Sequence, residues 1–309
     1  MTTPTNAQTP FKPSDLASVL AVIVIWGLNF VVMKVGLASF TPFQLGAARF
    51  GLAFLPLAFW VGLPQVRPRW ILAFGLTQGV GQFGLLFVAL RVGMTAAVAS
   101  VVMQTQVFFT AILGAMLLRE RIGGPLRVGF AFAAAGLACF AANVWTAHGT
   151  AVTGWGLALN LGSAFMWACS NIVVRKAQQD SGAFQPLPFV VWASAVAIVP
   201  FLLLSWCFDP PGSQGNWRHA PWQAWAAVAA LGWLATSLAY GLWTGLLKRF
   251  AASRVAPFSL GVPVIGMLAG IAFLGETIAP LQWAGVFLVF CALCCVLLAQ
   301  RLPPASSRP

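Results

Sequence analysis

Apolar residues fall in ten runs along the chain, and short polar connections separate these runs. A helix needs about 20 apolar residues to cross a bilayer, and each run is close to that length. The longest connection between them, Phe208 to Trp222, is rich in proline, glycine, serine and tryptophan. We therefore expect an all-α membrane protein whose partner is the lipid bilayer. The ten predicted spans are Leu16–Leu37, Phe43–Val61, Trp70–Leu90, Thr95–Leu118, Val128–Val144, Trp155–Val174, Pro188–Cys207, Gln223–Leu246, Val255–Leu274 and Leu281–Leu298.

The composition supports this interpretation and excludes several classes of protein. Of 309 residues, 60% are hydrophobic and only 7% are charged, whereas about a quarter are charged in soluble domains. The apolar excess also excludes a disordered chain. The formal net charge of +12 could suggest nucleic acid, but the basic residues form small clusters between apolar runs rather than a stripe on one face. We expect no nucleic-acid partner and a location in the cell inner membrane.

The basic residues alternate between the two sides of the predicted spans. Under the positive-inside rule, the richer side faces the cytoplasm. This side holds both tails, residues 1–15 and 301–309, so we expect an even number of spans and cytoplasmic termini. Thirteen of the 17 basic residues fall there: Lys12, Arg67, Arg69, Arg119, Arg121, Arg127, Arg175, Lys176, Lys248, Arg249, Arg254, Arg301 and Arg308.

The second half of the chain repeats motifs of the first. The segment from Asn29 to Lys34 is echoed from Asn171 to Lys176, and Glu120-Arg121-Ile122 is echoed by Glu276-Thr277-Ile278. We therefore expect two five-helix repeats, residues 16–146 and 154–300. Because five is odd, the second repeat enters the membrane inverted relative to the first. Inverted repeats are a transporter architecture, in which two similar halves open one central site to each side in turn.

Several motifs resemble a known family. They are Trp26-Gly27-Leu28-Asn29-Phe30 with Lys34, Ala48-Arg49-Phe50, Glu120-Arg121, Trp167-Ala168-Cys169-Ser170-Asn171 and Val262-Pro263-Val264. Together they resemble the EamA-type branch of the drug/metabolite transporter superfamily, from about Val22 to Leu298. Within that branch, Gln82-Phe83, Gln104-Thr105-Gln106 and Tyr240-Gly241-Leu242-Trp243 resemble exporters of O-acetylserine and cysteine. The resemblance implies secondary transport by alternating access.

The family often carries a proline in both the fourth and the ninth span. Here Pro263 has Val107 as its repeat mate, so we expect helix breaking to be asymmetric between these two spans.

The spans contain little that supports enzymatic chemistry. No Asp, Glu or His lies in the middle of a predicted span, which removes paired acids and a Ser-His-Asp set. Cys291, Cys294 and Cys295 are spaced like metal ligands, but small packing residues explain them better. Gly79–Gly84 matches a dinucleotide fingerprint without a preceding strand, so close helix packing is the better explanation. We expect no enzyme activity, cofactor or metal.

Uncharged polar and aromatic residues within the spans predict a substrate site. Trp167 and Asn171 share one face of their span, as do Gln78 and Gln82. Gln104 and Gln106 lie about 200° apart on a helix, so at most one faces a cavity, and we choose Gln104. Pro263 frees a backbone carbonyl that could accept from a substrate ammonium, or it could serve only to kink the helix. The predicted substrate-binding residues are Trp26, Asn29, Gln78, Gln82, Gln104, Trp167, Asn171, Tyr240, Trp243, Thr244 and Pro263.

Three cations leave alternatives open. Arg49 lies about two turns inside the second span with no acid in the spans to pair with it. It could meet a substrate carboxylate, cap helix carbonyls or extend to lipid phosphate. Lys34 and Lys176 end the first and sixth spans and could be gate or anchor residues.

The sequence therefore predicts an exporter of a small zwitterionic metabolite, of the cysteine and O-acetylserine type. Export of aromatic amino acids, purines or drug-like amines is an alternative. A non-transporting membrane sensor or scaffold is a further one. The sequence leaves the coupling ion and the oligomeric state open.

Overall fold

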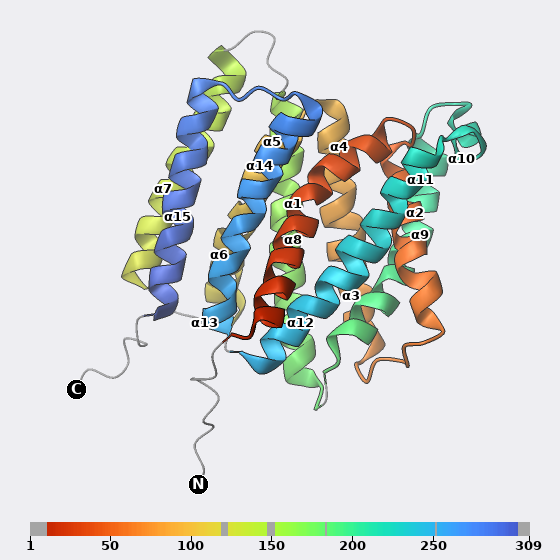
Figure 1. The fold of residues 1–309 in the computed structure, drawn as a ribbon, viewed down its shortest axis with the longest axis horizontal. Coiled ribbons are helices and arrows are strands. Elements are labelled where there is room, and N and C mark those ends of the chain that lie inside the picture. The colour runs from red at the N-terminus through yellow and green to blue at the C-terminus, as the bar shows by residue number, and fades with distance from the viewer. Residues whose placement is uncertain (1–10, 119–122, 147–151, 183, 251, 302–309) are drawn as a thin grey trace.

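The structure is a computed structural model that describes residues 11–118, 123–146, 152–182, 184–250 and 252–301, and every element in this part of the chain is helical (Figure 1). A short 3-10 turn and α10 (Asn216–His219) lie in the longest connection. The principal helices are α1 (Pro13–Leu37), α2 (Pro42–Ala58), α3 (Pro68–Phe74), α4 (Gly84–Val92), α5 (Ala96–Val102), α6 (Gln106–Leu118), α7 (Gly124–Thr146), α8 (Gly154–Asp180), α9 (Pro186–Phe208), α11 (Trp222–Ala229), α12 (Ala239–Arg249), α13 (Ala252–Val255), α14 (Gly261–Leu274) and α15 (Pro280–Arg301).

Within the described residues several helices join end to end, so the ten apolar runs of the sequence correspond to ten helical segments. Eight of these segments are long and apolar enough to cross a membrane. The other two are shorter: α2 has 17 residues, and Phe258–Leu274 is the remaining apolar helix. The start of α1 and the end of α15 lie at the same end of the bundle (Figure 1).

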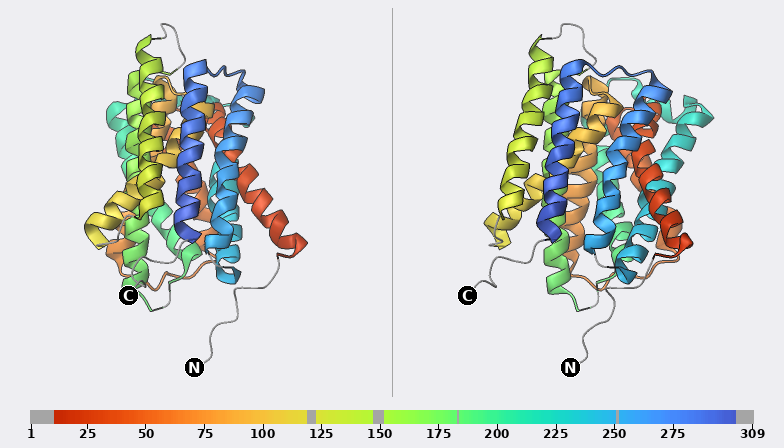
Figure 2. Two further views of the ribbon diagram at one scale, coloured as in Figure 1. Left: turned by 90° about the vertical axis from the view of Figure 1, so that its left-hand side faces the viewer. Right: turned by 60° about the vertical axis from the view of Figure 1, so that its left-hand side comes forward.

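The helix pairs repeat when the two halves of the chain are exchanged. Helix α1 packs against α12 and α14, and α8 packs in the same way against α4 and α6. Two further pairs, α2 with α9 and α7 with α15, each join equivalent helices of the two halves. Figure 2 shows the second of these pairs, with the yellow-green α7 beside the dark blue α15. This exchange places one pair of related helices, α1 and α8, on either side of the centre.

The helices that pack against α1 and α8 are irregular in both halves. A π-helical segment, η1 (Gly75–Phe83), joins α3 to α4, and a second one, η4 (Ala230–Leu238), joins α11 to α12. Likewise, a 3-10 turn, η2 (Met103–Thr105), joins α5 to α6, and η5 (Ala256–Leu260) precedes α14. The expected asymmetry between the fourth and ninth spans is therefore limited to the proline, because 3-10 geometry interrupts the fourth segment as well, without a proline.

Close helix packing explains the glycines of the apparent dinucleotide fingerprint. A Cβ on Gly79 would lie 2.7 Å from the Ala197 Cβ of α9, and one on Gly81 would clash with the Met166 side chain of α8. These two glycines therefore let η1 approach α9 and α8, as predicted. Gly241 and Gly245, which lie four residues apart, do not mark a close helix contact, because no atom lies within 4 Å of a Cβ added at either position.

Candidate functional site

A central cavity of about 690 Å³ lies between the helices that surround α1 and α8. Such a volume falls in the range of small-molecule sites. Ten of the eleven predicted substrate-binding residues line it: Trp26, Asn29, Gln78, Gln82, Gln104, Trp167, Asn171, Tyr240, Trp243 and Thr244. Pro263 does not. Residues of α2, α9 and α15 also contribute to the lining, beyond the six spans that carry the predicted residues.

The cavity opens at one end of the bundle. Its lining reaches the exposed Arg175 and Gln178 near the end of α8, and Pro186 at the start of α9. At the other end, Leu90 and Met94 are buried in the main apolar core. The open end is therefore the one at which α1 begins and α15 ends (Figure 1).

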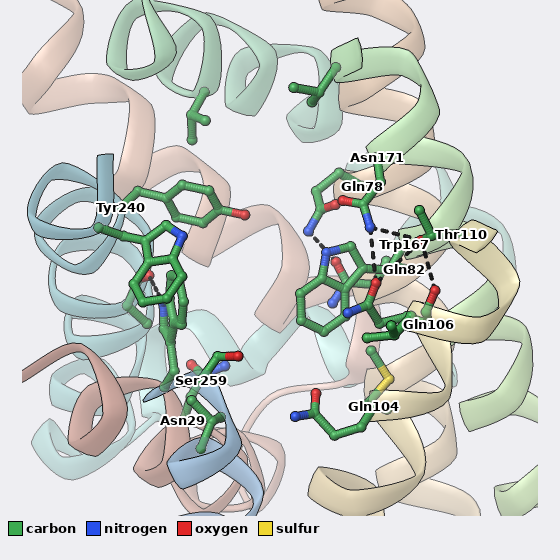
Figure 3. Close-up of a pocket in the computed structure, with 18 of the residues that line it drawn as sticks. Asn29, Gln78, Gln82, Gln104, Gln106, Thr110, Trp167, Asn171, Tyr240 and Ser259 are labelled. Atoms are coloured by element: carbon green, nitrogen blue, oxygen red, sulfur yellow. Dashed lines mark hydrogen bonds between the residues drawn. The ribbon is translucent and has the colours of Figure 1, made fainter. Parts of the chain in front are cut away.

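One side of the cavity is formed by amide side chains that bond to one another, and we call it the amide wall (Gln78, Gln82, Gln106, Thr110 and Asn171; Figure 3). The Gln78 amide donates to the Gln82 side-chain oxygen. The Asn171 Nδ2 donates to Gln106 Oε1 at 2.9 Å and to Thr110 Oγ1 at 3.1 Å. The polar groups of the amide wall therefore take up most of one another's hydrogen-bonding capacity.

The predicted site rejected Gln106 in favour of Gln104 and did not include Thr110. Both Gln104 and Gln106 line the cavity, so the expectation that at most one does is wrong. The 3-10 turn η2 lies between α5 and α6 and breaks the regular α-helical rotation on which that expectation rested. The spacing of four residues between Gln106 and Thr110 places them on one helix face and could have indicated their shared role.

The opposite side is mainly aromatic, and we call it the aromatic wall (Trp26, Asn29, Tyr240, Trp243 and Thr244). The Trp26 ring centroid lies 5.6 Å from those of both Tyr240 and Trp243. The Trp26 Nε1 donates to the Ala235 carbonyl oxygen at 3.0 Å. Figure 3 shows the Tyr240 hydroxyl pointing toward the space between the walls. The Asn29 Oδ1 is buried with no hydrogen-bond partner.

Arg49 of α2 also lines the cavity, and it is only 2% exposed. Its Nη2 donates to Thr236 Oγ1 at 3.2 Å, and its Cζ lies 3.8 Å from the Phe83 ring centroid. Its Nε and Nη1 are buried without hydrogen-bond partners. No Asp or Glu stands among the described residues that line the cavity.

The two lysines with a suggested gate role lie outside the cavity lining. The Lys34 Nζ donates to the Leu90 carbonyl oxygen at 2.9 Å, and Arg91 Nη1 donates to the Leu37 carbonyl oxygen at 3.2 Å. Lys34 therefore ties α1 to α4 at the closed end, which matches the anchor role rather than an anion contact. Lys176 lies half-buried on α8. The Glu120-Arg121 pair lies outside the described residues.

Pro263 itself lies outside the cavity lining. It is the third residue of α14 and follows the 3-10 segment η5, so it stands in the first helical turn. A proline there removes no interior hydrogen bond. Its own carbonyl oxygen accepts from Ser100 Oγ at 3.3 Å. The carbonyl that a proline deprives of a donor is the one four residues earlier, which here belongs to Ser259, a residue of the cavity lining.

Comparisons with known proteins agree with this architecture. The EamA-like transporter family model matches the chain twice, over residues 14–142 and 154–298. A probable amino-acid metabolite efflux pump of Salmonella typhimurium is 39% identical over 276 residues, which are 89% of this chain and 91% of that protein. A protein of the same name in Escherichia coli K12 is 37% identical over 275 residues, with the same coverage of both chains.

A solved crystal structure is similar over 95% of this chain and 100% of its own, with a TM-score of 0.62. At 20% sequence identity, this similarity supports the fold alone. The family of the chain follows from the two matches of the family model and from the two relatives, which are 37–39% identical over 89% of its length. The chain belongs to the EamA-like transporter family and is a multi-pass protein of the inner membrane.

Proposed function

We propose that the protein exports small zwitterionic metabolites of the cysteine and O-acetylserine type. The single observation that carries this proposal is the cavity lining, which combines neutral amides, aromatic rings and Arg49 without an acid among its described residues. Amide and hydroxyl groups can bind both an ammonium and a carboxylate. The names of the two similar efflux pumps support an amino-acid metabolite as cargo.

Alternating access is the transport mechanism that we propose. The ten helical segments cross the membrane as two inverted five-helix repeats, with both chain ends in the cytoplasm. The matching helix pairs of the two halves support this arrangement, because related halves can exchange conformations. In this topology the open end of the cavity faces the cytoplasm, and the structure represents the state that loads substrate for export.

Uptake into inverted membrane vesicles tests the function. We expect vesicles that contain the protein to accumulate labelled cysteine or O-acetylserine, and Trp167→Ala and Asn171→Ala to lower that accumulation. Uptake equal to that of empty vesicles would contradict the proposed cargo, and uptake unchanged in both variants would contradict the proposed site. Reporter fusions at the two chain ends test the topology, which fails if the reporters lie on different faces.

A larger substrate is a second candidate, favoured by the size of the cavity. A volume of about 690 Å³ suits drug-sized ligands, and its tryptophans can stack on aromatic amino acids, purines or amines. Competition against labelled cysteine uptake separates the two proposals. Stronger competition by phenylalanine or adenine than by O-acetylserine would favour the second candidate.

A further inference from the structure

Arg49 is a buried charge that the protein itself does not neutralise. The side chain is 2% exposed and lines the cavity. A buried charge is costly unless it is paired and hydrogen-bonded. No Asp or Glu is found among the described lining residues to supply that pairing.

The contacts of Arg49 remove two of the three roles that its sequence position allows. Because it is enclosed by protein, the guanidinium does not extend to lipid phosphate. It does not cap helix carbonyls either, since its hydrogen bond goes to the Thr236 hydroxyl and its Nε and Nη1 have no partner. The role that remains is contact with an anion in the cavity.

The guanidinium is held in place between the two halves of the chain. Phe83, the last residue of η1, covers it at 3.8 Å from ring centroid to Cζ. Thr236, within η4, accepts from Nη2 and in turn donates to the Leu231 carbonyl oxygen at 2.9 Å. Because Nη2 carries two hydrogens and uses one for Thr236, its second hydrogen and an unpartnered neighbour, Nε or Nη1, remain on one edge of a fixed, planar group, which suits two-point contact with a carboxylate.

We propose that Arg49 binds the carboxylate of the transported metabolite. The inference rests on the proposed function and specifies its cargo as a compound with a free carboxylate, rather than a simple amine or a purine. Tyr240, which lines the same side pocket as Arg49, lies beside this subsite. A charge-assisted hydrogen bond to a carboxylate changes affinity by about tenfold or more.

The test compares ligands that differ only in the carboxylate. In inverted vesicles, cysteine, cysteamine and cysteine methyl ester compete with labelled cysteine. For the wild-type protein we expect the two compounds without a free carboxylate to compete at least about tenfold more weakly. Equal competition by all three compounds would overturn the inference, and this measurement needs no variant.

Variants locate the effect at Arg49. The quantity compared is the ratio of the two inhibition constants, that of cysteamine divided by that of cysteine, which we call the competition ratio. We expect R49Q to bring this ratio close to one. We expect R49K to give an intermediate ratio, because it keeps the charge but loses the planar group. R91Q is the matched control, since Arg91 bonds to the Leu37 carbonyl outside the cavity lining, and it should keep the wild-type ratio. If R49Q does not insert, R49K and the wild-type ratio decide the question.

The outcomes separate this inference from the proposed function. A wild-type ratio in R49Q would overturn the carboxylate subsite while leaving cysteine export intact. The protein could instead transport a larger amino acid and not cysteine. If R49Q then no longer prefers that amino acid over its amine analogue without the carboxylate, the result would support the subsite and contradict the small cargo. Transport only of compounds that lack a carboxylate would contradict both.

Discussion

The two walls of the cavity differ in how their polar atoms are used. On the amide wall, Asn171 donates to Gln106 and Thr110, so its amide nitrogen is already committed. On the aromatic wall, the repeat-related Asn29 has a buried side-chain oxygen without a partner. The amide wall therefore holds its own helices together, whereas the aromatic wall and Arg49 offer unsatisfied groups to a ligand. We therefore expect the aromatic wall and Arg49 to contribute more to substrate affinity than the amide wall does.

We expect the largest loss of stability and of substrate uptake from removing Trp26, the residue at the centre of the aromatic wall. Trp26→Ala deletes a ring that contacts Tyr240 and Trp243 and a hydrogen bond to Ala235. Burial lost from a tryptophan site costs about 3 kcal/mol of stability, and substrate uptake should fall to background. Thermal unfolding in detergent, followed with a thiol-reactive dye, measures the loss of stability, and uptake into inverted vesicles measures the loss of transport.

Trp26→Phe is the matched control for this variant. It keeps an aromatic ring but loses the donor to the Ala235 carbonyl oxygen, so we expect a cost of about 1 kcal/mol. A loss as large as that of Trp26→Ala would mean that the hydrogen bond, rather than the ring, holds the wall in place.

The repeat-related asparagines give the sharpest test of the comparison. Asn29→Ala removes a free acceptor suited to a substrate ammonium, so we expect affinity to fall about tenfold with little change in stability. Asn171→Ala removes a donor from two protein groups. It should lower stability by about 1 kcal/mol, and its effect on uptake should come mainly through the altered wall.

Competition curves give the affinity of each variant, and thermal unfolding gives its stability. If Asn171→Ala weakens affinity more than Asn29→Ala does, at unchanged stability, the roles of the two walls are reversed.

A smaller effect is expected within the amide wall. Gln78 accepts from Ser170 and donates to Gln82. Gln78→Leu leaves the Gln82 oxygen without this donor, whereas Ser170 keeps its bond to the Trp167 carbonyl oxygen. We expect a loss of about 1 kcal/mol in stability and an unchanged ratio of cysteine to cysteamine competition. A changed ratio would place Gln78 in contact with the substrate.

The sequence was most informative about the helical segments and less so about their ends. The predicted span Pro188–Cys207 corresponds closely to α9 (Pro186–Phe208). By contrast, α8 continues six residues beyond the predicted Val174, to Asp180. Hydropathy reports how apolar a segment is, and the polar residues from Arg175 onward still form backbone hydrogen bonds.

Irregular helix geometry was not predictable from the sequence. In η4, Thr236 donates to the Leu231 carbonyl oxygen five residues earlier, a pattern that depends on packing rather than on local residue preference. The same limit applies to the site. Spacing correctly grouped Gln78 with Gln82 on one face, but only the tertiary structure shows that they bond to each other. Whether a polar residue is free to bind a ligand depends on partners that are distant in the sequence.

The smallest effect is expected at Pro263, which the sequence suggested as a ligand contact. Its ring stands in the first turn of α14, where a missing backbone donor costs nothing, and Ser100 already bonds to its carbonyl oxygen. Pro263→Ala keeps that carbonyl and should change stability by less than about 0.5 kcal/mol, with cysteine affinity within about twofold of the wild type. Ser100→Ala is the companion variant, because it frees the carbonyl without altering the helix. A tenfold change in affinity in Ser100→Ala would show that substrate reaches this carbonyl, and would extend the ligand surface beyond the aromatic wall to the contact between α5 and α14. The same change in Pro263→Ala alone would point instead to the Ser259 carbonyl, four residues earlier.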